Sequence, residues 1–366
     1  WHAYRGAERT ALETLLTEYE TLHPEHTVQA RAIPYDGFNS KLEAAVPRGH
    51  GPDLFIAAHE RLGTWVPLGL VQATPYPITD VPDTVEQALF HEGTSYGLPL
   101  AFKTLALFYN RDRIAAPPKT TDALIELAIA ERDAGRIGLA YQATEPFFHA
   151  PWMHGFGGGL LQDETVELNR SGAVNALEFA KDLADQKLIP EEPTSALVTQ
   201  LFNDGNAAMV INGPWFLGEI NPEINLGVAP LPIVSATGAS AAPYLTVEAI
   251  QVSAHSKNTE ASWALAKWLT ETKQSIHRAV EGRQSVTAMS AYQDPRLASD
   301  PILSAFRDQL EHTQPMETGA WMGSSWEPLA RAIRRVMRGA HSPQDALNAA
   351  QQEFKVVTAP PPPPSN

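Results

Sequence analysis

Carboxylates stand next to a guanidinium or a ring at two places in this sequence. Glu60 and Arg61 follow the wholly apolar run 54–58, and Glu145 lies two residues before Phe147. Carboxylates and arginines bind hydroxyl groups, and rings cover apolar C–H faces, so these residue types together suit a sugar. The apolar run is predicted to be a strand, and ligands of open α/β sheets bind beyond the carboxyl ends of such strands.

Tryptophans supply the flat surfaces that such a ligand needs. A buried strand is predicted before Gly213 and Pro214, so that backbone geometry, and not packing alone, fixes the position of Trp215. Trp321 and Trp326 are expected just ahead of a helix start. Three indoles are therefore candidates for stacking on a ligand.

Each of these residues also has a purely structural interpretation. Glu60 and Arg61 would form a surface ion pair, and Glu145 would be a solvated loop acid. The tryptophans would belong to the core or to packing between domains. The sequence alone leaves both interpretations open.

Histidine spacing favours no metal site. His149 and His154 are five residues apart, off the i, i+4 spacing of a helical metal pair, and His23 and His26 are expected at an exposed helix end. The sequence has no cysteine, which excludes thiol catalysis, disulfides and cysteine-based zinc sites. We therefore expect neither a metal ion nor another cofactor.

The composition is that of an acidic, folded protein. Hydrophobic residues make up 43% of the chain and charged residues 19%, and the net charge is −15. This charge disfavours nucleic acid and anionic membranes as partners, because phosphate binding requires clustered lysine and arginine. No apolar run reaches the roughly 18 residues of a membrane helix. A chain of 366 residues is long enough for two globular units, and we expect a monomer.

Helical and strand patterns alternate along the chain. Helices are predicted over 7–22, 38–46 and 173–187, and strands over 28–33, 54–58 and 105–109. Wholly apolar strands between helices are typical of parallel sheets that are covered on both faces. The pattern therefore predicts an α/β fold built on parallel sheets.

Two helices are predicted near the end of the chain. One has Pro328 in its first turn and carries Leu329 and Ile333 on its apolar face. The other begins with Ser342 as its cap and Pro343 as its first residue.

The order of these segments resembles the sugar-binding proteins of ABC importers, the maltose-binding protein group. The resemblance rests on residues 202–206, 207–215 and 225–232 and extends over nearly the whole chain, residues 1–357. It implies a two-lobed periplasmic-binding-protein fold of type II with a hinge of three chain segments, near residues 104, 247 and 300. Lobe 1 is expected at 1–104 and 247–299, lobe 2 at 105–246 and 300–357, and a Pro-rich tail or linker at 358–366.

The resemblance also assigns roles to single residues. In that group the tryptophans matching Trp215 and Trp326 stack on sugar faces, the acid–arginine pair binds hydroxyls, and the acid–ring turn adds a carboxylate and a ring. Met316 falls on a ligand-lining position, and Tyr4 and Arg5 lie near the group's first binding loop. The expected ligand-binding residues are Tyr4, Arg5, Glu60, Arg61, Glu145, Phe147, Trp215, Met316, Trp321 and Trp326.

Three positions depart from the maltose binders of that group. Those proteins carry a tryptophan where this chain has Ala57, an acid where it has Lys103 and an arginine where it has Ala330. The fold tolerates such changes, but the loss of a stacking ring and the reversal of a charge reshape a site. The identity of the ligand therefore does not follow from the resemblance.

The leading interpretation is a non-enzymatic receptor of a carbohydrate ABC importer. It would bind a maltose- or maltodextrin-like oligosaccharide between two lobes, close around it and deliver it to a membrane permease. One alternative is a glycoside hydrolase with Glu60 and Glu145 as its carboxyl pair, which requires a separation of about 5–5.5 Å or about 6.5–9.5 Å. The two acids are expected on different lobes, which disfavours that alternative. The other alternative is a sugar sensor that is not coupled to transport.

The two ends of the sequence carry expectations about the natural polypeptide. Trp1 is not a translation start, so we expect a secretory leader before it and a periplasmic or extracytoplasmic location. The run Pro360 to Pro364 favours polyproline II and predicts a stiff spacer of roughly 15 Å. We expect this spacer to tether the receptor to a membrane segment beyond Asn366, in particular of the importer itself. A disordered end is the alternative.

Overall fold

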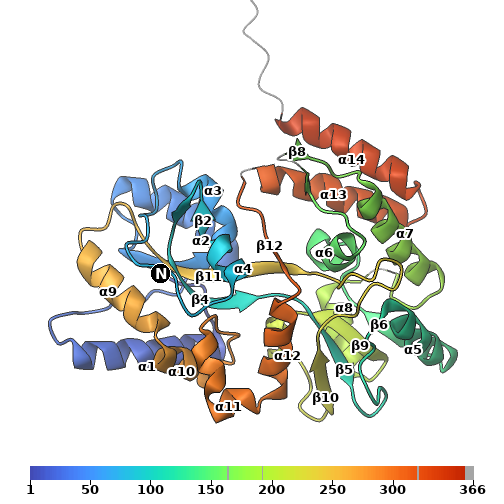
Figure 1. Cartoon of the computed structure of the whole chain (residues 1–366), viewed down its shortest axis with the longest axis horizontal. Coiled ribbons are helices and arrows are strands. Elements are labelled where there is room, and N and C mark those ends of the chain that lie inside the picture. The colour runs from blue at the N-terminus through green and yellow to red at the C-terminus, as the bar shows by residue number, and fades with distance from the viewer. Residues whose placement is uncertain (163–164, 192, 320, 359–366) are drawn as a thin grey trace, which may run out of the picture. The chain divides into compact units, whose positions relative to one another are not determined.

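The chain folds into two units of mixed helix and strand, seen in a computed structural model that describes residues 1–162, 165–191, 193–319 and 321–358 (Figure 1). Unit 1 comprises Trp1–Lys103, Leu245–Ser304 and Pro315–Ala320. Unit 2 comprises Thr104–Tyr244, Ala305–Gln314 and Trp321–Asn366. The predicted α/β class is confirmed, whereas the predicted lobe boundaries and hinge stay a prediction.

Unit 1 is built on strands β1 (Leu54–Ala58), β4 (Leu98–Lys103) and β11 (Tyr244–Val252). β11 pairs with both of the others, and both pairings are antiparallel. The other elements that lie in this unit are α1 (Gly6–Leu22), α2 (Tyr35–Ala45), η1 (Val46–Arg48), η2 (His59–Arg61), α3 (Leu62–Trp65), α4 (Asp83–Ala88), β2 (Phe90–His91), β3 (Thr94–Ser95), α9 (Thr259–Thr270), α10 (Thr272–Gly282), η4 (Met289–Gln293) and α11 (Pro295–Ala298).

Hydrophobic packing anchors β1 in the core of unit 1 through Phe55. Phe55 is fully buried on this strand and meets Trp65 edge to face, with ring centroids 5.4 Å apart. On another side of the unit, α1 packs against α10, and Figure 1 shows the two helices next to each other. The strand that leads to Glu60 is therefore held on a rigid core.

Unit 2 is built on a four-stranded sheet of order β10-β5-β9-β6: Leu226–Ala229, Ala106–Asn110, Ala207–Asn212 and Ile137–Ala140. The pairs of β5 with β10 and β9 are antiparallel, and β6 with β9 is parallel. Its other elements are α5 (Thr121–Asp133), α6 (Pro146–Gly155), β7 (Leu161–Gln162), β8 (Thr165–Val166), α7 (Ser171–Asp185), α8 (Ser195–Asn203), η3 (Pro214–Gly218), α13 (Trp321–Met337) and α14 (Pro343–Thr358). Two further elements, α12 (Pro301–Leu310) and β12 (Gln314–Pro315), each have residues in both units.

The prediction of parallel sheets is wrong for most of these pairs. Apolar strands do not reveal their direction when the strands that pair are far apart in the sequence, as β1 and β11 are. The predicted strand 28–33 is also wrong: it makes only a one-residue bridge, between His2 and Ala32. The pairing with the segment of His2 does not extend beyond this bridge, and residues 29–32 are exposed.

The start of the penultimate helix differs from the prediction as well. α13 begins at Trp321, so Pro328 lies inside the helix and both tryptophans are helical. Met322 and Ser325 extend the buried face upstream of the proline, and Leu329 continues it directly after the proline. This packing offsets the backbone hydrogen bond that proline cannot make. The predicted cap of α14 is confirmed, since Ser342 Oγ accepts from the Asp345 N–H at 3.1 Å.

The Pro-rich segment from Ala359 onward, predicted to be a spacer, lies outside the described residues. Among the helices that the structure describes, none has the length and apolar character needed to cross a bilayer. α13 and α14, which precede this segment, pack against each other in unit 2 (Figure 1).

Candidate ligand-binding site

Four aromatic side chains of unit 2 lie in a continuous series, which we call the ring cluster: Trp215, Phe147, Tyr244 and Trp326. The centroid of Phe147 is 6.2 Å from that of Trp215 and 6.4 Å from that of Tyr244, and Tyr244 is 6.2 Å from Trp326. Tyr244 is buried, Phe147 and Trp326 are half-buried, and Trp215 is 43% exposed. The series therefore links the core of the unit to an accessible indole.

The backbone holds Trp215 where it is. β9 is buried at every residue, and the 3-10 helix η3 starts at Pro214 immediately after Gly213. A Cβ atom on Gly213 would lie 2.2 Å from the indole of Trp215, closer than atoms can approach. Glycine is thus needed here for a close approach, and its φ of −97° shows that a left-handed backbone is not the reason.

Phe147 and Glu145 occupy the start of α6. Pro146 is the first helical residue, and Glu145 stands at the N-cap without a side-chain cap bond. The positive end of a helix favours a carboxylate nearby. Since this half-exposed carboxylate does not cap the helix, it is free to accept a hydrogen bond from a ligand beside the ring cluster.

α13 contributes Trp326 to the ring cluster. Trp321 is five residues earlier on the same helix, which turns by 100° per residue, so the two indoles point about 140° apart. One face of the helix therefore presents only one of them, and the structure places Trp326 against Tyr244. Ala330, where maltose binders carry arginine, is 2% exposed on this helix.

Unit 1 carries a group of charged side chains that we call the acidic set: Glu8, Glu60 and Glu248, with Tyr4 and Lys103. Lys103 Nζ is 2.7 Å from Glu8 Oε1 and 3.9 Å from Glu248 Oε2. The Tyr4 hydroxyl donates to Glu248 Oε2 at 3.3 Å. Lys103, a departure from the maltose binders, is thus paired with carboxylates of this chain.

Glu60 contains an unsatisfied acceptor. Its Oε2 atom is buried and has no hydrogen-bond partner in the described part of the chain. Burial raises the pKa of Glu60, and the charge on Glu248 adds to this rise, while its own backbone and Arg61 oppose it. Arg61 and Arg5 are exposed. A buried carboxylate oxygen without a hydrogen-bond donor raises the free energy of the folded state, and such atoms are found at functional sites.

His59 ties the segment of Met316 to the strand core. Its Nδ1 accepts from the Val247 N–H at 3.0 Å, so its Nε2–H donates to the Met316 carbonyl at 2.9 Å. The bond that Nδ1 accepts requires the neutral ring, and burial lowers the pKa of His59 to about 4. Gly63 also approaches this segment, because a Cβ there would lie 1.8 Å from the Thr318 carbonyl oxygen. The backbone of Met316 is therefore held at its carbonyl by His59 and at its N–H by the Leu245 carbonyl, 3.0 Å away.

The structure adds three neighbours of the predicted residues that were not predicted as such: Glu248, Tyr244 and His154. Glu248 is the one charged residue of strand β11, and a charge within a mostly apolar strand was a usable signal. His154 meets Tyr244 edge to face with centroids 4.9 Å apart, and its Nδ1–H donates to the Ala242 carbonyl. Burial lowers the pKa of His154 to about 4, so it supports Tyr244 as a neutral ring.

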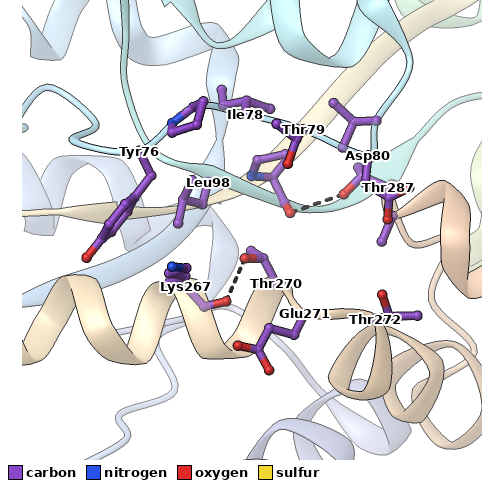
Figure 2. A pocket seen from close by; sticks show the side chains of 14 residues that line it. Tyr76, Ile78, Thr79, Asp80, Leu98, Lys267, Thr270, Glu271, Thr272 and Thr287 are labelled. Atoms are coloured by element: carbon purple, nitrogen blue, oxygen red, sulfur yellow. Dashed lines mark hydrogen bonds between the residues drawn. The ribbon is translucent and has the colours of Figure 1, made fainter.

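A separate cavity of about 420 Å³ lies on unit 1 (Figure 2). Figure 2 shows Tyr76 above α9, with Lys267 Nζ 5.1 Å from its ring centroid. Polar groups of the wall already have partners: Thr287 donates to the Pro99 carbonyl and Thr270 to that of Lys267. None of the predicted ligand-binding residues lines this cavity, and we assign it no ligand.

Exposed rings on one unit and a buried carboxylate oxygen without a partner on the other are each the kind of group that binds a polar solute with apolar faces. The chain belongs to the bacterial extracellular solute-binding protein family, whose model matches residues 14–305. The family and the relatives found are binding proteins and not enzymes.

Individual relatives match the chain over most of their length. The chain is 28% identical to a maltotriose-binding protein of Pyrococcus abyssi, over 96% of this chain and 80% of the relative. It is 29% identical to a galactooligosaccharide-binding protein of Bacillus subtilis, over 90% and 83%. A crystal structure of a cyclo/maltodextrin-binding protein with maltotetraose superposes with a TM-score of 0.88 at 27% identity, over 97% of this chain and 95% of the other. The predicted two-lobed fold is confirmed by this likeness.

Proposed function

We propose that this protein is the solute receptor of a carbohydrate ABC importer and that its ligand is a maltodextrin-like oligosaccharide. The observation that carries the proposal is the ring cluster, in which an indole held by backbone geometry is 43% exposed. Exposing an indole in this way costs free energy unless a ligand covers it.

The ring cluster and the acidic set suit different parts of a sugar, its C–H faces and its hydroxyl groups. Trp215, Phe147 and Trp326 offer ring faces to the C–H faces of pyranose units. Glu60 offers a buried oxygen that lacks a donor, and a sugar hydroxyl supplies one. We propose that both groups of residues act on the same ligand, with Glu145, Arg61 and Met316 among its contacts, and with Trp321, Tyr4 and Arg5 nearby.

The relatives narrow the class of ligand. Two of the relatives named above bind, by name, maltotriose and galactooligosaccharide, and a solved neighbour from Bdellovibrio bacteriovorus, 27% identical, is bound to maltotriose. These ligands are all short oligosaccharides. We place maltotriose and maltotetraose first for this chain. We keep galactooligosaccharide as the second candidate, because Ala57 and Lys103 depart from the maltose binders.

Delivery to a membrane permease follows from the importer role. We propose that the protein works outside the cytoplasm, as the family name implies, and that ligand closes two lobes about a hinge near residues 104, 247 and 300. Fusion or tethering through the Pro-rich segment 358–366 is part of the same proposal. A sensor that does not feed a transporter would bind equally well, and uptake of labelled maltotriose by cells with and without the gene distinguishes the two.

The test is a sugar panel read by calorimetry and tryptophan fluorescence, with product analysis of every mixture. Maltose, maltotriose, maltotetraose, galactooligosaccharide and trehalose are titrated separately. Saturable binding of a maltodextrin without new products supports the proposal. Binding of galactooligosaccharide alone overturns the choice of sugar but not the receptor role. Release of shorter sugars would instead favour a hydrolase, although Glu60 and Glu145 belong to different units.

A further inference from the structure

A turn that follows α1 brings two histidines and a glutamate together. The helix ends at Leu22, because Pro24 cannot continue it, and the N–H of His26 donates to the carbonyl of His23 at 2.9 Å. Beyond the turn, the N–H of Val28 donates to a carboxylate oxygen of Glu20 on α1 at 2.8 Å. The turn is therefore fastened to the helix at both of its ends.

The three side chains of this turn have the separations of metal ligands. One atom each of His23, Glu25 and His26 lies within 4.8 Å of the others. Two ligands of a tetrahedral zinc ion, each about 2.0–2.1 Å from it, lie about 3.3 Å apart. Nδ1 of His23 and Oε1 of Glu25 are already 3.4 Å apart. Since no pair of the three ligand atoms is more than 4.8 Å apart, each pair has to close by no more than about 1.5 Å to reach that separation.

The surroundings of the turn fix the rings and favour a cation. Tyr19 is 1% exposed, its ring lies 4.4 Å from His23 and 5.8 Å from His26, and Trp268 packs on it at 5.3 Å. The Tyr19 hydroxyl lies 3.2 Å from Nδ1 of His26, the kind of outer contact that orients metal-binding histidines. The carbonyls at the end of α1 carry the negative end of the helix dipole, which attracts positive charge.

We propose that His23, Glu25 and His26 bind a divalent transition-metal ion of the zinc type, with water in the remaining position. Two imidazoles and one carboxylate suit Zn²⁺, Ni²⁺ or Cu²⁺, whereas Mg²⁺ and Ca²⁺ prefer sites made of oxygen ligands. The ion joins the end of α1 to the following turn and, through Tyr19, to Trp268 of α9. Its role is to stabilise unit 1, independently of any sugar.

The test is calorimetry of the full chain, stripped with a chelator, against zinc chloride. We expect one tight site per chain, binding weakened by at least about tenfold in His23→Ala and in His26→Ala, and a smaller loss in Glu25→Gln. His255→Ala removes an exposed histidine elsewhere in unit 1 and is the matched control, with binding unchanged. Magnesium chloride should give no heat.

A second readout is independent of total zinc uptake. Cobalt(II) at a site with nitrogen ligands absorbs visible light, and this absorption should appear with the wild-type chain and with His255→Ala but not with His23→Ala. Circular dichroism of each variant without metal checks that it is folded. The proposal is overturned if the wild-type chain takes up no zinc in the millimolar range, or if the His23 and His26 variants bind zinc as the wild type does.

Discussion

The ring cluster of unit 2 and the acidic set of unit 1 are positioned by different physical means. Trp215 is placed by Gly213, Pro214 and a buried strand, none of which carries a charge. Glu60 and Glu248 are placed among one another's charges, and burial raises the pKa of both. Ring geometry should therefore be insensitive to pH and salt, whereas the acidic set and the histidine beside it should respond to pH.

The largest expected effect is on the pH dependence of unit 1. Burial lowers the pKa of His59 to about 4 from 6.5, so the unfolded chain binds a proton there between those values and the folded chain does not. Stability is therefore complete above pH 6.5 and is lost as the pH falls towards 4, by about 3 kcal/mol from this group. Urea unfolding at pH 7, 6, 5 and 4 measures the loss.

His59→Gln isolates this contribution from the other titrating groups. An amide can still accept from Val247 and donate to Met316, but it does not titrate. The variant should lose less stability than the wild type between pH 6.5 and 4, although His149 and His154 also have a pKa lowered to about 4 and remain in both proteins. Parallel curves for the two proteins would contradict the role given to His59.

The second prediction concerns the exposed indole. Trp215→Ala should weaken binding of the best sugar by about 1–3 kcal/mol and leave the midpoint of unfolding almost unchanged, because the side chain is already partly in water. Trp326→Ala should weaken binding similarly. Calorimetry and thermal unfolding of the same samples give both quantities.

Trp152→Ala is the contrasting variant, since this indole is fully buried in unit 2 and its removal should cost about 3–5 kcal/mol of unfolding free energy. If Trp215→Ala instead unfolded without cooperativity, with affinity unchanged in the folded fraction, Trp215 would be a core residue.

A third, smaller effect tests the backbone account of the ring cluster. Gly213→Ala places a methyl group where the indole of Trp215 now lies, so the ring must turn away and sugar affinity should fall by about 1 kcal/mol. Gly218→Ala is the matched control in the same 3-10 helix, since a Cβ there has nothing within 4 Å. Equal affinities of the two variants would show that the close approach does not position the ring.

The smallest effect is expected at Lys103. Lys103→Gln should lower the unfolding free energy at pH 7 by less than about 1 kcal/mol, because its partners Glu8 and Glu248 are not fully removed from water. It should also raise the pKa of Glu248 further, since Lys103 opposes the rise. Arg9→Gln, which breaks an exposed pair with Glu13, is the reference. A loss of several kcal/mol would mean that Lys103 holds the acidic set together.

The sequence predicted local structure well where one segment contained the whole signal. The helix predicted at 7–22 is α1 at Gly6–Leu22, and the strand predicted at 54–58 is β1. The errors at 28–33 and at Pro328 arose where the outcome depended on a partner far away in the chain. Propensity does not reveal whether a second strand is present or whether a helix face finds a core.

The candidate site shows the same difference between residues with a local signal and residues that depend on distant parts of the chain. Phe147 and Trp215 were named from short motifs, and the structure brings their rings together, while their role in binding stays a prediction. Glu248 was not named, because its place beside Tyr4 and Lys103 arises only when β11 lies between β1 and β4. Long-range strand pairing therefore brings Glu248 to Tyr4 and Lys103, and no local sequence pattern encodes that pairing.

Pro328 inside α13 removes one backbone hydrogen bond from this helix. In a regular helix the N–H of residue 328 would donate to the carbonyl of Ser324, and proline has no such hydrogen. That carbonyl belongs to the residue two positions before Trp326, so the missing hydrogen bond lies in the helical turn that carries this indole. A peptide oxygen does not titrate, and only a change at Pro328 would restore its helical donor. The turn that carries Trp326 is thus one backbone hydrogen bond short, whatever the neighbouring side chains are.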